Sequence, residues 1–209
     1  MASSDFWQRA AGAWAGEASY FDGEMRPIIA AYGNVLRIDV AASGAVAINE
    51  WKQYPSSELA RRAAGGKLAD GEGWEVASVQ LGQLDTAGNL DCGEQGCFVL
   101  VEQHSALREI RDPETQAPRY RVWHTLSGSD VLATMQYGFW YTAFEADYYN
   151  RPLRDPVSGE TRPNSRLGQI KGISLFRYRR IAPAQLEAAR AERRARFGIR
   201  SAAAGVRQQ

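Results

Sequence analysis

The stretch YRVWHTLSGSDVLATMQYGFWYTAF, Tyr120–Phe144, contains two runs of β-branched and aromatic residues separated by the short sequence LSGSD. Val, Thr, Tyr, Phe and Trp favour strands, whereas Gly, Ser and Asp favour the tight turns that connect strands. The stretch therefore predicts two antiparallel strands joined by a turn, over residues 119–126 and 131–145.

The same pattern of strand-forming runs and turn residues extends over most of the chain. Turn sequences such as FDGE, AASGA, ADGEG, DTAGN and CGEQG separate short apolar runs. Together these runs predict eight strands, over residues 14–21, 34–41, 45–54, 74–84, 97–103, 119–126, 131–145 and 168–181. Eight antiparallel strands are the number that a small closed barrel uses.

Three other segments predict helices. Residues 3–11 have serine at the start and apolar residues on one side, and residues 56–65 (SSELARRAAG) join Ser-Ser to good helix formers. Residues 182–200 have Pro183 in the first turn and Gly198 at the end, as helices commonly do.

The expected fold is mainly β, an antiparallel barrel with a short N-terminal helix and a C-terminal helix. The alternative is an α+β cone of the cystatin/NTF2 type, which normally places a longer helix before its sheet. We expect one domain over residues 1–200, followed by a disordered tail over residues 201–209.

The composition is that of an ordinary globular protein, with 23% charged residues and a net charge of +1. Such a charge attracts neither nucleic acid nor an anionic membrane. No apolar run approaches twenty residues, and the N-terminus does not resemble a secretory signal. We therefore expect no nucleic-acid or membrane partner and a cytoplasmic location. The arginines of the C-terminal helix are interpreted as a solvated face, since Glu187 and Glu192 lie within reach of them.

The two cysteines, Cys92 and Cys97, lie in the sequence LDCGEQGC. Zinc prefers four ligands, and neither His104 nor His124 has ligand spacing, so no metal site is predicted. Two reduced thiols are the main expectation, and a disulfide at the tip of a hairpin is the alternative.

The two ends of the chain carry further signals. Residues 11–23, AGAWAGEASYFDG, contain the triplet Gly12-Ala13-Trp14, and residues 172–181, GISLFRYRRI, carry several arginines. With the Gly-rich turns between them, these segments resemble the calycin or lipocalin-like barrels, which are closed cups with an N-terminal helix. The resemblance implies an internal apolar cavity. It also implies that Trp14 packs against Arg177 or Arg179 and closes the base of the barrel.

Side chains alternate along a strand, so the more apolar face of each strand is expected to point into such a cavity. These faces carry a polar set: Tyr20, Glu50, Lys52, His124, Tyr137, Tyr141 and Arg177. Buried charges cost several kcal/mol unless they are paired or hydrated. The polar set is therefore more typical of a ligand pocket than of a solid core.

The seven aromatic residues between Tyr137 and Tyr149 predict one wall of this pocket. The expected catalytic residues are Glu50 or His124 as acid–base group and Arg177 with Tyr137 as the groups that hold an anion. The expected substrate-binding residues are Tyr20, Lys52, Tyr54, Phe139, Tyr141 and Tyr148.

Common catalytic signatures are missing from the sequence: GxGxxG after a strand, GxxxxGK[ST], HExxH and GxSxG. We therefore expect no cofactor and no metal. Some lipocalin-like barrels decarboxylate phenolic acids without a cofactor, using Tyr, Arg and Glu in the cup. The function expected by this resemblance is a cofactor-independent lyase, decarboxylase or isomerase that transfers protons on a small phenolic substrate. The alternative is a non-catalytic carrier or sensor of a hydrophobic molecule.

The expected partner is accordingly a small hydrophobic or aromatic molecule, and a homodimer is one option for the assembly. The segment 148–168 contains three prolines and four arginines and is long for a loop in a compact domain. It is interpreted either as a flap that carries Tyr148 over the mouth of the cup or as a disordered surface hairpin.

Overall fold

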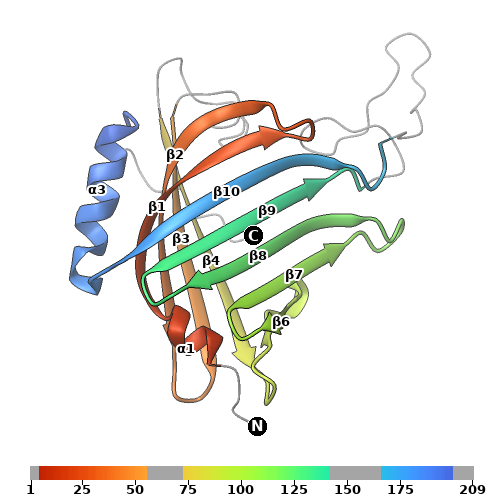
Figure 1. Cartoon of the computed structure of the whole chain (residues 1–209), viewed down its shortest axis with the longest axis horizontal. Helices are drawn as coiled ribbons and strands as arrows, with labels where there is room; N and C mark the ends of the chain where they lie inside the picture. Colours follow the sequence, from red (N-terminus) through yellow and green to blue (C-terminus); the bar gives the residue numbers. More distant parts are fainter. Residues whose placement is uncertain (1–4, 56–72, 142–165, 200–209) are drawn as a thin grey trace.

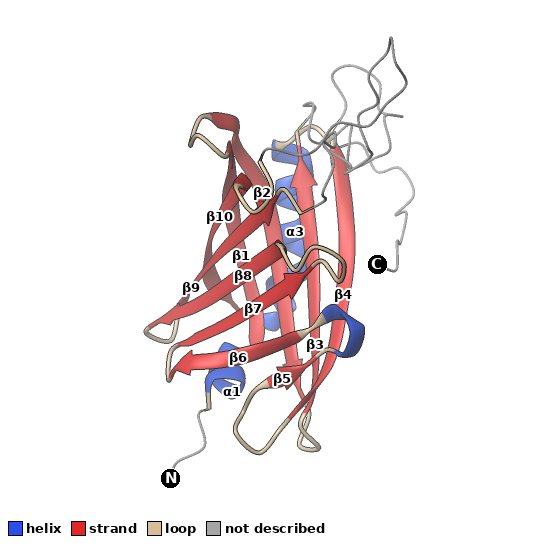
Figure 2. Cartoon of the chain, turned by 90° about the vertical axis from the view of Figure 1, so that its right-hand side faces the viewer, coloured by secondary structure: helices blue, strands red, loops and turns tan. Residues whose placement is uncertain are grey.

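The computed structural model describes residues 5–55, 73–141 and 166–199, which form an antiparallel β-barrel with one helix at its base and one along its outer wall (Figure 1, Figure 2). The ten strands are β1 (Gly12–Asp22), β2 (Pro27–Val40), β3 (Ala45–Tyr54), β4 (Trp74–Leu84), β5 (Leu90–Asp91), β6 (Cys97–Glu102), β7 (Ser105–Arg111), β8 (Pro118–Ser127), β9 (Val131–Phe139) and β10 (Ile170–Ile181). The helices are α1 (Phe6–Ala10) and α3 (Leu186–Arg196), with short 3₁₀ turns η1 (Gly93–Gln95) and η2 (Pro183–Gln185).

Each strand pairs with its neighbour in the sequence, and β1 pairs with β10 to close the barrel. The expected barrel with a short N-terminal and a C-terminal helix is thus confirmed, in preference to the α+β cone. The helix expected over residues 56–65 and the tail expected over residues 201–209 lie outside the described residues.

The sequence missed two strands, β5 and β7, and the first half of β2. In β7, with the sequence SALREIR, Arg108 points inward between Ala106 and Ile110. This charge interrupts the apolar alternation by which the other strands were recognised. The strand expected over residues 131–145 ends at Phe139.

Trp14 and Arg180 close the base of the barrel. The Trp14 side chain is fully buried, and the Arg180 guanidinium lies over its ring, 4.1 Å from the centroid. Arg180 also donates to the backbone oxygens of Ser129, Ala11 and Arg9. The contact between Trp14 and an arginine that the lipocalin resemblance implies is therefore present. The arginine is Arg180 and not Arg177 or Arg179, because Arg180 is the one paired with Trp14 on the inward face.

Helix α3 covers the outer face of β1, β2 and β3 (Figure 1). Leu186 and Ala189 pack against Ala13, Ala15 and Val35. Its Arg190 lies over the Trp51 ring at 4.6 Å and pairs with Glu75 at 2.7 Å. Arg190 also pairs with Glu187 one turn away, as the charge pattern of this helix predicted.

Both cysteines are free thiols; Cys92 is buried and Cys97 is exposed. Among the described residues, no three His, Cys, Asp or Glu side chains gather as metal ligands would. Nor does the described part of the chain contain a helix long and apolar enough to cross a membrane.

Candidate functional site

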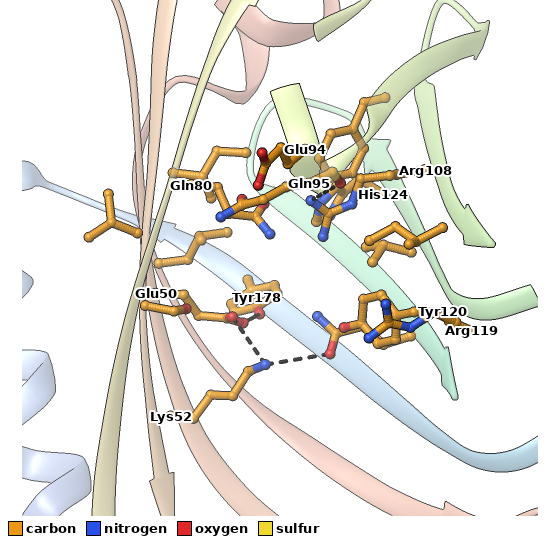
Figure 3. A pocket seen from close by; sticks show the side chains of 18 residues that line it. Glu50, Lys52, Gln80, Glu94, Gln95, Arg108, Arg119, Tyr120, His124 and Tyr178 are labelled. Carbon is orange, nitrogen blue, oxygen red and sulfur yellow. Dashed lines mark hydrogen bonds and ion pairs between the residues drawn. The ribbon is translucent and has the colours of Figure 1, made fainter. Parts of the chain in front are cut away.

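The barrel encloses a cavity of about 510 Å³ between α1 at the base and the opposite end of the strands. Figure 3 shows the side chains that line it. They are Leu36, Ile48, Glu50, Lys52, Ser78, Val79, Gln80, Glu94, Gln95, Phe98, Arg108, Ile110, Arg119, Tyr120, Val122, His124, Gln136 and Tyr178. The size of this cavity is typical of small-molecule sites, and its wall combines aliphatic and aromatic side chains with a larger than usual share of polar and charged ones.

Two strands supply much of the lining, and both have the facing that the sequence predicts. Strand β3 turns Ile48, Glu50 and Lys52 inward, and β8 turns Tyr120, Val122 and His124 inward. The residues between them point outward; Trp51 of β3, for example, lies beneath α3. The alternation of these two strands therefore brings an acid, a base and an imidazole into one cavity.

Glu50 is the centre of a polar cluster in this cavity (Figure 3). Its carboxylate lies 3.1 Å from Lys52 Nζ and accepts hydrogen bonds from Asn34 Nδ2 at 2.7 Å and from the Tyr178 hydroxyl at 3.4 Å. Lys52 also donates to Gln136 Oε1 at 3.5 Å. A partly buried carboxylate with three donors is held in one orientation, as a preorganised site requires.

The charge state of the cluster follows from its burial. Burial disfavours a charged Lys52, but the Glu50 carboxylate, together with smaller contributions from Tyr54, Tyr120 and Tyr32, raises the pKa of Lys52 well above its ordinary value. Burial raises the pKa of Tyr120 to about 12 and that of Tyr178 well above the ordinary value. At neutral pH the cluster therefore contains one ion pair and neutral phenols.

His124 is a neutral member of the cavity wall. Burial, with a smaller contribution from the positive charge of Arg108, lowers the pKa of His124 to about 4. Its Nδ1 lies 2.7 Å from Thr134 Oγ1, and its ring stacks on Phe98 with centroids 5.2 Å apart. At neutral pH this imidazole can accept or donate a hydrogen bond but carries no charge.

Several residues expected at the site lie elsewhere in the barrel. Tyr20 and Tyr54 point inward and pack against the core without lining the cavity, and Tyr54 stacks on Tyr32 at 4.8 Å. Tyr148, and with it most of the segment interpreted as a flap, lies outside the described residues.

The facing expected for β9 and β10 was wrong, and four expected site residues consequently lie outside the cavity. The Tyr137 hydroxyl donates to Met135 Sδ at 3.4 Å on the outer face, and the Phe139 ring lies 5.6 Å from the Arg121 guanidinium. Tyr141 contacts Arg119 beyond the end of β9. Arg177 is exposed and is paired in register with Ala133 and Glu17.

The cause of this error is the polarity of the cavity itself. Thr134 and Gln136 of β9 point inward and are paired with Phe176 and Ser174 of β10. Because Gln136 meets Lys52 inside the barrel, the inner face of β9 is its more polar face. A rule that turns the more apolar face inward therefore selects the wrong side of this strand.

Sequence reasoning also left out cavity residues that the structure brings together, chiefly Arg108, Tyr120 and Tyr178, and the buried Asn34 that donates to Glu50 behind them. The alternation of β8 placed Tyr120 inward, on the face of His124, so this signal was present. Tyr178 is paired with Gly16 of β1, which places it on the inward face. This pairing is known only from the structure.

No protein-family model matches the sequence, and no curated protein matches it significantly. Among the solved structures that match the chain are the following three. The S-type phycobiliprotein lyase of Guillardia theta is 11% identical with a TM-score of 0.50, covering 87% of this chain and 93% of that chain. A protein of unknown function from the DUF3598 family of Nostoc punctiforme is 13% identical with a TM-score of 0.49, covering 84% of this chain; this chain spans only 49% of it. The siderocalin Ex-FABP is 11% identical with a TM-score of 0.27, covering 96% of this chain and 95% of that chain.

At these identities the likeness concerns the fold alone. The closed ten-stranded barrel, which the lyase shares at the level of the fold, fits the architecture that the lipocalin-like resemblance implies.

Proposed function

We propose that the barrel binds a small, largely apolar and partly aromatic molecule inside its cavity. The observation that carries the proposal is the cavity of about 510 Å³ whose aromatic and aliphatic walls surround the fixed Glu50–Lys52–Tyr178 cluster. Apolar walls provide affinity, and a few fixed polar groups orient the ligand. A cytoplasmic location and, as an option, a homodimer are further parts of the proposal.

A ligand that binds only the folded chain raises the melting temperature. At a concentration of 100 times the Kd the stabilisation is about 2.7 kcal/mol, which in a chain of this size raises the Tm by roughly 5–10 °C. The test is a thermal-shift screen with phenolic acids, aryl dimers, long-chain fatty acids and haem. If no compound of any of these classes raises the Tm, the proposal is wrong.

A cofactor-independent lyase, decarboxylase or isomerase is the second candidate. It is favoured by the ion pair of Glu50 and Lys52 beside the Tyr178 hydroxyl, because these groups can exchange a proton with a bound phenol or hold a developing oxyanion. Neutral His124 is the other candidate base. Arg177 and Tyr137 have no part in this proposal, since both lie outside the cavity.

The two candidates differ in what happens to a ligand found by the screen. A carrier returns it unchanged, whereas a lyase consumes it, which chromatography of the incubated mixture detects. For a lyase, Glu50→Gln should lower the rate by roughly 10²–10⁴-fold at a nearly unchanged Kd. The control is Glu17→Gln, an outward carboxylate of β1 that pairs with Arg196. Equal rates for Glu50→Gln and the wild type would exclude Glu50 as the acid–base group.

A further inference from the structure

One buried cation in the cavity has no counter-ion among the described residues. Arg108 of β7 is only 4% exposed, and its guanidinium lies over the Phe98 ring at 4.7 Å. No carboxylate of the described chain lies within 4 Å of it. The partly buried Glu50 and Lys52 pair with each other, and the other charged residues of the lining, Glu94 and Arg119, are exposed. A guanidinium remains charged in a protein, so the cavity has one uncompensated positive charge.

Neutral groups occupy part of the hydrogen-bonding capacity of Arg108. Its Nη1 donates to the Gln95 backbone oxygen at 3.2 Å. With the Gln80 amide oxygen turned towards the guanidinium, this oxygen accepts from Nη1 at 3.0 Å and from Nη2 at 2.8 Å. Arg108 Nε, buried, has no hydrogen-bond partner in the described part of the chain. Neutral oxygens therefore occupy the positions in which a carboxylate would bind with two hydrogen bonds.

The titratable groups that face Arg108 do not cancel its charge. They are Tyr120, Cys92, His124 and Glu50. Burial keeps the phenol of Tyr120 and the imidazole of His124 neutral at pH 7, and it raises the pKa of the Cys92 thiol. Burying a charge without a partner is costly, so an anion that enters the cavity gains the interaction that the protein leaves incomplete.

Arg108 lies beside a part of the barrel wall where strand pairing is sparse. Strand β4 pairs with β5 only at Gln83 and Leu84. Strand β7 pairs with β6 as far as Arg108, and the rest of β7, up to Arg111, has no pair in β6. Gln80 on β4 and Arg108 on β7 face each other across this interval, next to η1, and Figure 2 shows β4 diverging from β6 and β7 there. The exposed residues Val79 and Glu94 line the cavity beside this interval, so the cavity reaches the surface close to the cation.

We propose that the ligand of this cavity is an anion, with one carboxylate or sulfonate held by Arg108 and a flat apolar body along Phe98, Val122 and Ile48. The anion replaces the Gln80 amide on the guanidinium, and the body extends towards the Glu50–Lys52 pair. This inference rests on the proposed function and specifies the chemical class of the ligand.

The test uses two fluorescent probes that share one skeleton and differ in charge. They are 1-anilinonaphthalene-8-sulfonate, an anion, and N-phenyl-1-naphthylamine, which lacks the sulfonate. The wild-type chain should bind the anion roughly 10- to 100-fold more tightly, the range expected of hydrogen bonds to a charged group. Arg108→Met should lower the affinity for the anion by the same factor and change that for the neutral probe by less than about threefold.

Arg177→Met is the matched control, since it removes an exposed arginine from the outer face of β10. It should leave both affinities unchanged. If Arg108→Met does not fold, Arg108→Lys keeps the charge but not the two-pronged geometry and should lose part of the preference for the anion. Equal wild-type affinities for the two probes, or an equal loss of both in Arg108→Met, would overturn the inference and leave the proposed function intact. Binding of neither probe would overturn the proposed function itself.

Discussion

Replacing Trp14 with alanine is expected to lower the free energy of unfolding by about 3–5 kcal/mol, the usual cost of deleting a buried tryptophan side chain. Trp14 is fully buried, donates from Nε1 to the Ala10 oxygen at 2.8 Å and forms the surface on which Arg180 lies. Its loss leaves a cavity beneath α1 and removes the cation–π contact of Arg180. Urea unfolding followed by far-UV circular dichroism measures the effect.

Trp123→Ala is the control for this variant. Trp123 lies on the outer face of β8 and is half-buried, so its removal should cost only about 1 kcal/mol. If the two variants lose the same stability, the base of the barrel does not depend on Trp14 in the way that its contacts indicate.

Acidification should destabilise the fold through His124, by up to about 3 kcal/mol between pH 6.5 and pH 4. Burial lowers the pKa of this histidine in the folded chain to about 4, whereas an exposed histidine in the unfolded chain keeps a pKa of about 6.5. In this window the unfolded chain binds more protons than the folded chain, so stability is present above pH 6.5 and is lost as the pH falls.

The measurement is the free energy of unfolding at several pH values for the wild type and for His124→Gln. Glutamine can still hydrogen-bond to Thr134 but does not titrate. The carboxylates titrate in both proteins, so the difference between the two curves isolates His124. That difference should shrink by about 3 kcal/mol towards pH 4. Parallel curves would show that the imidazole is not kept neutral by burial.

The sequence was sufficient for the barrel and for the part of its cavity that β3 and β8 supply. Turn residues at regular intervals identified most strands, and β3 and β8 have a clear two-residue period that placed Glu50, Lys52 and His124 correctly. The Gly-x-Trp triplet predicted the closed base, although it did not identify Arg180 as the partner of Trp14.

The remaining cavity residues depend on interactions that a single strand does not reveal. Arg108 faces inward in β7, but its charge interrupts the apolar alternation by which that strand could have been predicted. Gln136 faces inward and contacts Lys52, which belongs to a strand far away in the sequence. The aromatic side chains of β9 instead lie on the outer face, where Phe139 contacts Arg121 and Tyr137 contacts Met135. Side-chain polarity predicts facing only where the interior is apolar, and a polar cavity reverses the rule.

The central claim, that the ligand binds inside the barrel, is tested most directly by filling the cavity. Ser78 lines the cavity and is paired in register with Glu50, so Ser78→Trp places an indole where the ligand is expected. Ala133→Trp adds the same side chain at an exposed position on the outer face of β9. The measurement is the Kd of 1-anilinonaphthalene-8-sulfonate for both folded variants. We predict that Ser78→Trp raises the Kd roughly tenfold or more, a loss of about 1.4 kcal/mol, while Ala133→Trp leaves it unchanged. An unchanged Kd in Ser78→Trp would show that the ligand binds elsewhere on the chain.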